Sequence, residues 1–262
     1  MSNKNCFGKT TVGQKVLMSV TGLMLFGFLT SHLAGNMLLF DCIGGQKAFN
    51  DYAHALTSNP LIYVAEAGLL GIFLVHVILA IKVSLAGKAA RDSQYKVRTN
   101  QGKSSIFSRS MIQTGSVVFI FIVLHLWTFK FGTEYAEQTK AEKAVTSIVQ
   151  DVKKVTADIT GKEVAVATTT ELKKGEVRDL YKTVTEEFKK TWYACLYIFA
   201  MVVMGFHLAH AFQSAFQTLG VRHPKYTPHI QKASIALALF YSIGFMVFPI
   251  YFGFIHNPAE GK

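Results

Sequence analysis

The sequence predicts an all-α integral membrane protein, a bundle of five transmembrane helices with a small helical extracytoplasmic insertion. Half of the 262 residues are hydrophobic and 16% are charged, against about 25% charged residues in soluble domains. A bilayer core of about 30 Å requires about 20 mostly apolar residues in a helix. Five stretches meet this requirement, at residues 16–40, 61–85, 111–131, 192–216 and 234–255.

The net charge and the number of cysteines further narrow the partners and cofactor sites expected for this protein. Lys and Arg exceed Asp and Glu by 27 − 16 = 11 residues, which suggests either nucleic acid or a membrane surface as a partner. Because the excess lies beside the apolar stretches, we expect the lipid bilayer and no nucleic acid. Cys6, Cys42 and Cys195 are too few for a disulfide scaffold, and no Cys-x-x-Cys pattern occurs. This argues against thiolate metal clusters and covalently attached haem.

The distribution of Lys and Arg predicts how the chain is inserted. These residues crowd the N-terminal tail, the loop after the second stretch and the connection before the fifth, whereas the first loop has only Lys47 beside Asp41 and Asp51. We therefore expect a multi-pass protein of the bacterial inner membrane, with the N-terminus cytoplasmic and the C-terminus extracytoplasmic. The first stretch is expected to be retained, because its apolar run is too long for a signal peptide and no small-residue cleavage site follows.

The chain divides into residues 1–131 with the first three spans, an extracytoplasmic insertion at 132–191, and residues 192–262 with the last two spans. The insertion is neutral, with eleven basic and eleven acidic residues. Apolar residues recur at helical spacing in two places, which predicts two amphipathic helices on either side of the β-branched stretch 164–170. They are Val145, Ile148, Val149, Val152, Val155 and Ile159 in the first helix, and Val177, Leu180, Val184 and Phe188 in the second.

Each of the first four spans contains a histidine, and ionisable residues inside a membrane are rare and usually functional. Each histidine lies three or four residues beyond the centre of its span. Because successive spans run in opposite directions, this constant offset places the histidines alternately at two levels in the membrane. At ~1.5 Å per residue the two levels are roughly 10 Å apart. His32 and His125 are expected to share the level toward the outside, and His76 and His207 the level toward the cytoplasm.

Two histidines at one depth on different helices match a bis-histidine haem, whose iron takes an imidazole from each side. The two levels therefore predict two non-covalent b-type haems. His210 lies three residues after His207, on nearly the same face of its helix. We expect His207 to be the ligand because its depth matches that of His76, and His210 to contact a haem edge or propionate.

The segments around these histidines resemble a known family. They are FLTSHLAGN, FLVHVILAIKV, VLHLWTFKFG and GFHLAHAFQSAFQTLG, with SNPLIYVAEAGLL opening the second span. The family is the five-helix, dihaem cytochrome b membrane-anchor subunit of succinate:quinone oxidoreductases (succinate dehydrogenase and fumarate reductase). The resemblance covers the chain apart from 132–191. It implies that His76 and His207 bind the proximal haem iron, and His32 and His125 the distal haem iron.

The resemblance also implies partners and a role in the respiratory chain and the tricarboxylic acid cycle. A flavoprotein subunit would carry FAD and the dicarboxylate site, and an iron–sulfur subunit would carry the clusters. This chain would pass electrons between the iron–sulfur subunit and membrane quinone, with menaquinone the expected species. It would thus be an enzyme subunit for electron transfer and the quinone reaction only. Whether two such complexes form a dimer stays open.

Other residues are weaker candidates for a site. In some menaquinol:fumarate reductases a glutamate stands two residues before the fourth-span ligand, where this chain has Gly205. Glu66, the one carboxylate within a predicted span, is assigned with equal weight to a structural hydrogen bond or a quinone site. Haem propionates need basic or hydroxyl partners at the membrane edge. Candidates are Ser19 and Arg109 for the proximal haem, and Lys189 and Lys190 for the distal one.

Two alternatives stay open at this point. The first is a dihaem cytochrome b of a hydrogenase or formate dehydrogenase, which would keep the haems and change the partner. The second is a haem-free transporter that uses its membrane histidines as a proton relay.

Overall fold

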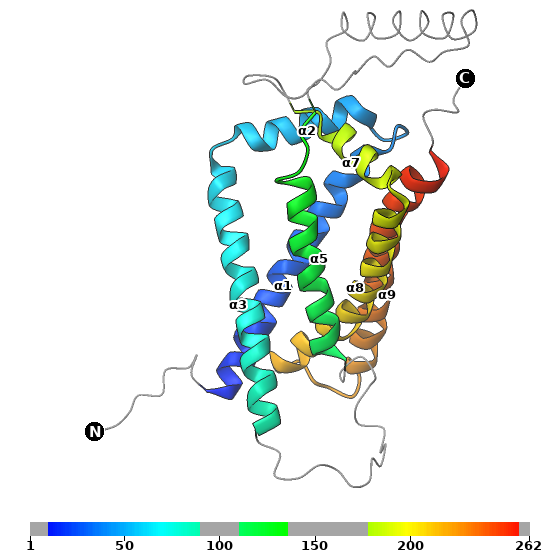
Figure 1. The fold of residues 1–262 in the computed structure, drawn as a ribbon. Helices are drawn as coiled ribbons and strands as arrows, with labels where there is room; N and C mark the ends of the chain where they lie inside the picture. Colours follow the sequence, from blue (N-terminus) through cyan, green and yellow to red (C-terminus); the bar gives the residue numbers. More distant parts are fainter. Residues whose placement is uncertain (1–9, 90–109, 136–177, 257–262) are drawn as a thin grey trace, which may run out of the picture.

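The computed structural model describes residues 10–89, 110–135 and 178–256 (Figure 1). Within these ranges the chain is helical without strands, and five of its helices are long and apolar enough to cross a membrane. The predicted fold class is confirmed, and the chain is a multi-pass membrane protein. The five helices are α1 (Thr11–Asn36, continued by the 3-10 turn η2 Met37–Leu39), α3 (Leu61–Ala89), α5 (Met111–Phe129), α8 (Thr191–Thr218) and α9 (Thr227–Ile250, continued by the π-helical turn η3 Tyr251–Ile255).

Helix α9 differs most from the predicted spans, because it begins at Thr227 rather than at Ser234. Its first turn contains Pro228, which is tolerated there because the first N–H groups of a helix have no partner within the helix. The difference follows from what each boundary measures. The predicted span counted apolar residues that fit the bilayer core, whereas the helix also includes the polar turn that leads into it.

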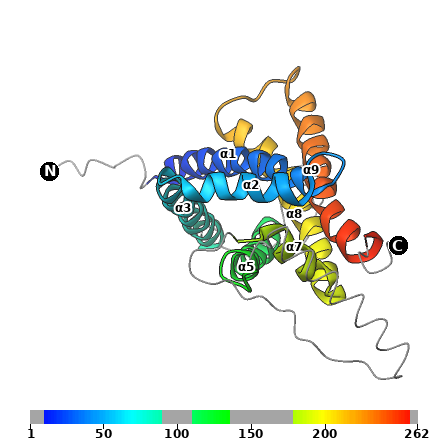
Figure 2. The same ribbon diagram turned by 90° about the horizontal axis from the view of Figure 1, so that it is seen from above.

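Four of the spanning helices surround a common centre. Helix α1 packs against α3 and α8, α5 packs against α8, and α3 approaches α5 at few positions. Figure 2 shows the resulting arrangement, in which α1 lies diagonally opposite α5 and α3 lies diagonally opposite α8. Helix α9 lies outside this group and packs along α8.

Helices α8 and α9 form the most closely packed pair. Ser234 Oγ donates to the Ala209 carbonyl at 2.7 Å, and Ser242 Oγ donates to the Met201 carbonyl at 2.8 Å. Gly205 stands against α9, since a Cβ atom there would lie 3.0 Å from Ser242 Oγ. Small and hydroxyl-bearing residues let membrane helices approach closely and hydrogen-bond to each other. The α8–α9 pair is therefore held by short-range packing as well as by apolar area.

A helix that the sequence analysis missed lies between the first two spans. Helix α2 (Gly45–Ser58) crosses one end of the bundle, where Figure 1 shows it beside α7. It starts at Gly45, whose φ of +70° favours glycine. The apolar positions Phe49, Tyr52 and Leu56 recur at helical spacing and could have predicted it. The segment was taken as a simple loop because it is too polar and too short to span a membrane.

Helix α7 (Leu180–Lys189) confirms the second amphipathic helix predicted in the insertion. Its apolar face buries Val184 and Phe188, and only Lys190 separates it from α8. The first predicted amphipathic helix, with Val145 to Ile159, and the stretch 164–170 lie outside the described residues. We refer below to the end of the bundle that carries α2 and α7 as the α2–α7 end.

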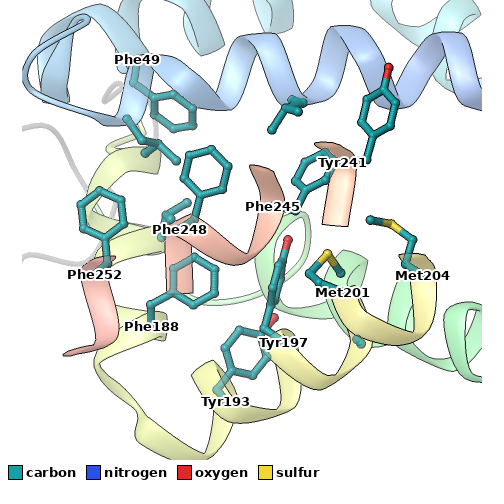
Figure 3. Packing of buried hydrophobic residues seen from close by; sticks show 14 residues of the cluster. Phe49, Phe188, Tyr193, Tyr197, Met201, Met204, Tyr241, Phe245, Phe248 and Phe252 are labelled. Carbon is teal, nitrogen blue, oxygen red and sulfur yellow. The ribbon is translucent and has the colours of Figure 1, made fainter. Parts of the chain in front are cut away.

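An aromatic cluster fills the α2–α7 end (Figure 3). Phe188 lies edge-on to Tyr197, with ring centroids 5.0 Å apart, and Phe40 stacks on Phe248 at 5.2 Å. Most of the fully buried apolar side chains come from α7, α8, α9 and η3, whereas α5 has none. Apolar burial in the described part of the chain is thus concentrated on one side of the bundle. The labelled members in Figure 3 are Phe49, Phe188, Tyr193, Tyr197, Met201, Met204, Tyr241, Phe245, Phe248 and Phe252.

Exposed aromatic residues mark a membrane boundary at the same end. Trp127 near the end of α5 is 72% exposed, Trp192 at the start of α8 is 67% exposed and Tyr63 at the start of α3 is 68% exposed. Trp and Tyr side chains gather at membrane–water interfaces because they have an apolar body and a polar tip. These three residues therefore surround the bundle where it would leave the hydrocarbon core.

Buried polar groups join α2 to α7. Asp179 is 3% exposed and Asn50 is 1% exposed. Asp179 Oδ1 accepts from the backbone N–H of Lys182 at 2.9 Å, which caps α7, and from Asn50 Nδ2 at 2.8 Å. Asp179 Oδ2 accepts from Gln46 Nε2 at 2.7 Å, and Asn50 Oδ1 accepts from the Tyr181 N–H at 2.9 Å. Burial raises the pKa of Tyr181 to about 12, so its phenol is neutral at physiological pH.

Replacing Asp179 by Ala should lower the stability of the protein by at least about 2 kcal/mol. The change removes a helix cap worth about 1 kcal/mol and leaves the buried amide donor of Asn50 and the partly buried one of Gln46 without their acceptor. The measurement is the thermal unfolding midpoint in detergent. Asp51→Ala is the matched control, because Asp51 is exposed and pairs with Lys47 on its own helix, so we expect a change below about 0.5 kcal/mol. Equal midpoints for the two variants would contradict the role of Asp179.

Replacing Gly205 by Leu should also destabilise the protein, by about 1–3 kcal/mol, because an added side chain must push α9 away or displace Ser242. The matched control is Gly68→Leu, since no atom lies within 4 Å of a Cβ built at Gly68. Thermal unfolding of both variants in detergent checks the comparison. A Gly205→Leu protein as stable as Gly68→Leu would show that α8 and α9 do not depend on this close approach.

Candidate functional site

The structure brings the four membrane histidines together in two pairs, each across a diagonal of the bundle. His32 on α1 and His125 on α5 have ring centroids 5.8 Å apart and planes at 89°. The Nδ1 atom of His125 is buried and has no hydrogen-bond partner among the described residues. An unpaired polar atom inside a bundle is costly, so this nitrogen suggests that the pair binds something further.

The second pair is His76 on α3 and His207 on α8, which lie close enough to interact electrostatically. Each ring also touches a neighbouring helix. His76 Nδ1 is 3.2 Å from Thr21 Oγ1 on α1, and His207 Nδ1 is 3.3 Å from Thr114 Oγ1 on α5. The hydroxyls and the rings thus form two equivalent contacts, one on each side of the bundle.

Glycine lets both of these rings lie against a helix backbone. A Cβ atom at Gly22 would stand 3.2 Å from His76 Cε1, and one at Gly115 would stand 3.3 Å from His207 Cε1. Both distances are shorter than ordinary van der Waals contact. A larger residue at either position would therefore push the imidazole toward the bundle centre.

The two pairs occupy different depths. His76 lies beside Gly22, ten residues before His32 on α1, and His207 lies beside Gly115, ten residues before His125 on α5. Ten residues of α-helix correspond to about 15 Å. The rings themselves are closer than this, because helical side chains lean toward the N-terminus of their own helix. The site therefore consists of an inner pair, His76 and His207, and an outer pair, His32 and His125, the latter nearer the α2–α7 end.

The outer pair has a spacing suited to a metal held by two imidazoles. Metal–imidazole bonds are about 2 Å long, so ring nitrogens on opposite sides of one ion stand about 4 Å apart and the ring centroids somewhat farther. The 5.8 Å between the outer centroids agrees with this spacing. The described residues contain no group of three or more metal-binding side chains. Two imidazoles are the donor set that a bis-histidine b-type haem takes from its protein.

The outer pair lies among aromatic side chains. His32 stacks on Phe28 at 5.3 Å and lies 5.8 Å from the ring of Phe245. His125 is flanked by Phe121 at 5.7 Å and Phe129 at 5.1 Å. Such a shell keeps water away from a metal site and lowers the local dielectric constant.

His210 differs from His207 in its contacts. Its Nδ1 lies 3.4 Å from Gln213 Nε2, one turn further along the same helix, whereas His207 contacts Thr114 on α5. His207 is thus the α8 histidine that takes part in contacts across the bundle.

Glu66 forms an ion pair with Lys130, with Oε1 and Nζ 2.5 Å apart. The pair joins α3 to α5 near the α2–α7 end, and both side chains are more than 40% exposed. This contact gives Glu66 a protein partner, and both roles predicted for it, the structural one and the quinone site, stay predictions. Sequence reasoning missed Lys130, which lies at the end of a predicted span and could have indicated a partner for the carboxylate.

The residues expected to face propionates have local partners. Ser19 is buried and donates to the Lys15 carbonyl at 2.9 Å on its own helix. Lys189 pairs with Glu186 at 2.6 Å, and Lys190 pairs with Glu187 at 2.7 Å. Arg109 lies outside the described residues.

Gly205 has a packing role rather than a proton-handling one. A Cβ there would meet the Ser242 side chain at 3.0 to 3.1 Å, so the position points at α9 and a glutamate could not be added without moving Ser242.

The chain was also compared with known proteins. No family model, no curated protein and no solved structure matches it. Its function is therefore argued from the histidine pairs and their surroundings.

Proposed function

We propose that this chain is the membrane-anchor cytochrome b subunit of a succinate dehydrogenase or fumarate reductase complex. In this role it carries electrons between an iron–sulfur subunit and membrane quinone through two b-type haems. The observation that supports the proposal best is the pairing of histidines across both diagonals of one bundle, at two depths. The inner pair, His76 and His207, would hold the proximal haem and the outer pair, His32 and His125, the distal haem.

The protein contributes binding, orientation and exclusion of water. The haems supply one-electron redox chemistry when bound. Imidazoles from opposite helices would hold each haem in position, and the aromatic shell around His32 and His125 would keep water from the outer site. Ligand type, hydrogen bonding and burial are the means by which a protein sets a haem potential.

The proposed orientation places the inner pair near the cytoplasm, where the iron–sulfur subunit would dock. The excess of Lys and Arg in the N-terminal tail and the second loop supports this orientation. The iron–sulfur clusters would belong to a partner subunit, since the three cysteines of this chain are too few to hold them, and FAD would belong to the flavoprotein subunit.

Because the two sites lie at different depths, electron transfer between them would depend on the membrane potential. Moving one elementary charge across the whole bilayer is worth about 2.3 kcal/mol per 100 mV, and an electron that passes from one pair to the other crosses part of that distance. Quinone, with menaquinone the expected species, would accept or donate the electrons within the membrane.

Purified protein should contain two b-type haems per chain, and His76→Ala and His125→Ala should each remove a different one. The measurement is a reduced-minus-oxidised spectrum with haem counted per polypeptide. His54→Ala is the control, because His54 is exposed on α2 and hydrogen-bonds to Ser58, so both haems should be retained. Loss of the same haem from both variants would contradict the proposal. A colourless wild-type protein would also contradict it, and would favour the histidine-relay transporter.

The complex isolated through a tag on this chain should contain a flavin-bearing subunit and an iron–sulfur subunit. The histidine pairs predict the haems but do not predict which enzyme subunits bind this chain. This measurement therefore separates the proposal from a cytochrome b that serves another oxidoreductase. Copurification of a nickel or molybdenum protein in place of the flavoprotein would support a hydrogenase or formate dehydrogenase instead.

A further inference from the structure

The two helices that support the inner pair carry the same sequence pattern. A Thr-Gly step, Thr21-Gly22 in α1 and Thr114-Gly115 in α5, stands ten to eleven residues before a histidine in each helix. Phenylalanines recur at the same positions between the Thr-Gly step and the histidine. They are Phe26 and Phe28 in α1, and Phe119 and Phe121 in α5.

In the structure the two Thr-Gly steps make the same kind of contact, each with one histidine of the inner pair. The step in α1 receives His76 from α3, with 3.2 Å between Thr21 Oγ1 and the ring Nδ1, and the step in α5 receives His207 from α8, with 3.3 Å between the corresponding atoms. Helix α1 lies opposite α5 and α3 lies opposite α8, so the two contacts stand on opposite sides of the bundle.

The surroundings of the hydroxyls decide which atom donates. Thr21 Oγ1 lies 2.9 Å from the Leu17 carbonyl oxygen and 3.0 Å from that of Met18, and Thr114 Oγ1 lies 3.0 Å and 3.2 Å from those of Ser110 and Met111. A carbonyl oxygen can only accept, so each hydroxyl hydrogen is used on the backbone. The free lone pair of the hydroxyl then accepts the proton of the histidine Nδ1. In both histidines Nε2 is left without a proton, as a metal ligand requires.

We propose that Thr21 and Thr114 are positioning residues for the inner pair. Each holds its histidine in the tautomer with a proton on Nδ1, and each Thr-Gly step keeps the ring against the backbone so that Nε2 is turned to the shared position between His76 and His207. The identity of the metal group rests on the proposed function above. The outer pair lacks this arrangement on one side, since His125 Nδ1 has no partner among the described residues.

The test uses Thr21→Val and Thr114→Val in the purified complex, because valine keeps the shape of threonine and removes the hydroxyl. A hydrogen bond from Nδ1–H makes the imidazole a stronger donor and favours the oxidised metal. Its loss should shift the oxidised-to-reduced equilibrium of the inner haem up to about tenfold toward the reduced form, which raises its midpoint potential by up to about 59 mV. The readouts are a redox titration followed optically and the low-spin EPR signal of each haem.

Matched variants separate positioning from general disturbance. Thr21→Ser and Thr114→Ser restore the hydroxyl and should restore the potential and the EPR signal. Ser116→Ala should change neither, since Ser116 is exposed on α5 and donates only to the Ile112 carbonyl at 2.8 Å. The haem of the outer pair should keep its potential in all variants. Loss of the inner haem alone from a valine variant, with recovery in the serine variant, would also support the proposal.

Two results would overturn it. The first is an unchanged potential and EPR signal in both valine variants that still hold two haems, which would leave the proposed function standing. The second is the loss of both haems together from a valine variant, which would indicate a structural role. A wild-type protein without haem would instead contradict the proposed function itself.

Discussion

A nitrogen-bearing ring inside a membrane bundle must find a partner for each of its polar atoms, and this constraint organises the centre of the protein. The hydrocarbon core of a bilayer supplies no water for hydrogen bonding, so an unpaired nitrogen costs more there than at a surface. His76 and His207 meet the constraint on one side of each ring through Thr21 and Thr114. Their other ring nitrogen and the buried Nδ1 of His125 have no comparable protein partner among the described residues. The helices are therefore placed by polar requirements as well as by apolar area.

Packing between the helices is correspondingly uneven. Helices α8 and α9 interlock through Ser234, Ser242 and Gly205, and most of the aromatic core lies on their side of the bundle. Helices α3 and α5 approach each other at few positions, and the Glu66–Lys130 pair joins them near one end. Helix α8 also packs against α5, whereas α3 packs mainly against α1. In the proposed function α8 therefore has two roles, because it packs against α9 and carries His207 of the inner pair.

The α2–α7 end is held together by buried hydrogen bonds between helices. Asp179 and Asn50 bring together two amphipathic helices from distant parts of the sequence through buried hydrogen bonds. These helices cover the aromatic cluster and the entry to α8, the helix that carries His207.

The sequence by itself determined the fold class, the five spans, the helix at 180–189 and the grouping of the histidines by depth. These features follow from two periodic quantities, apolar run length and rise per residue, which act along a single helix. Only the tertiary structure decided what lies beside each histidine. The contact of Thr21 with His76 joins residues 55 positions apart, and the packing of Gly205 against Ser242 joins two separate helices, so neither leaves a trace in the local pattern. Helix α2 was missed because it has no long apolar run of its own, and its packing against η2 and α7 appears only in the tertiary structure.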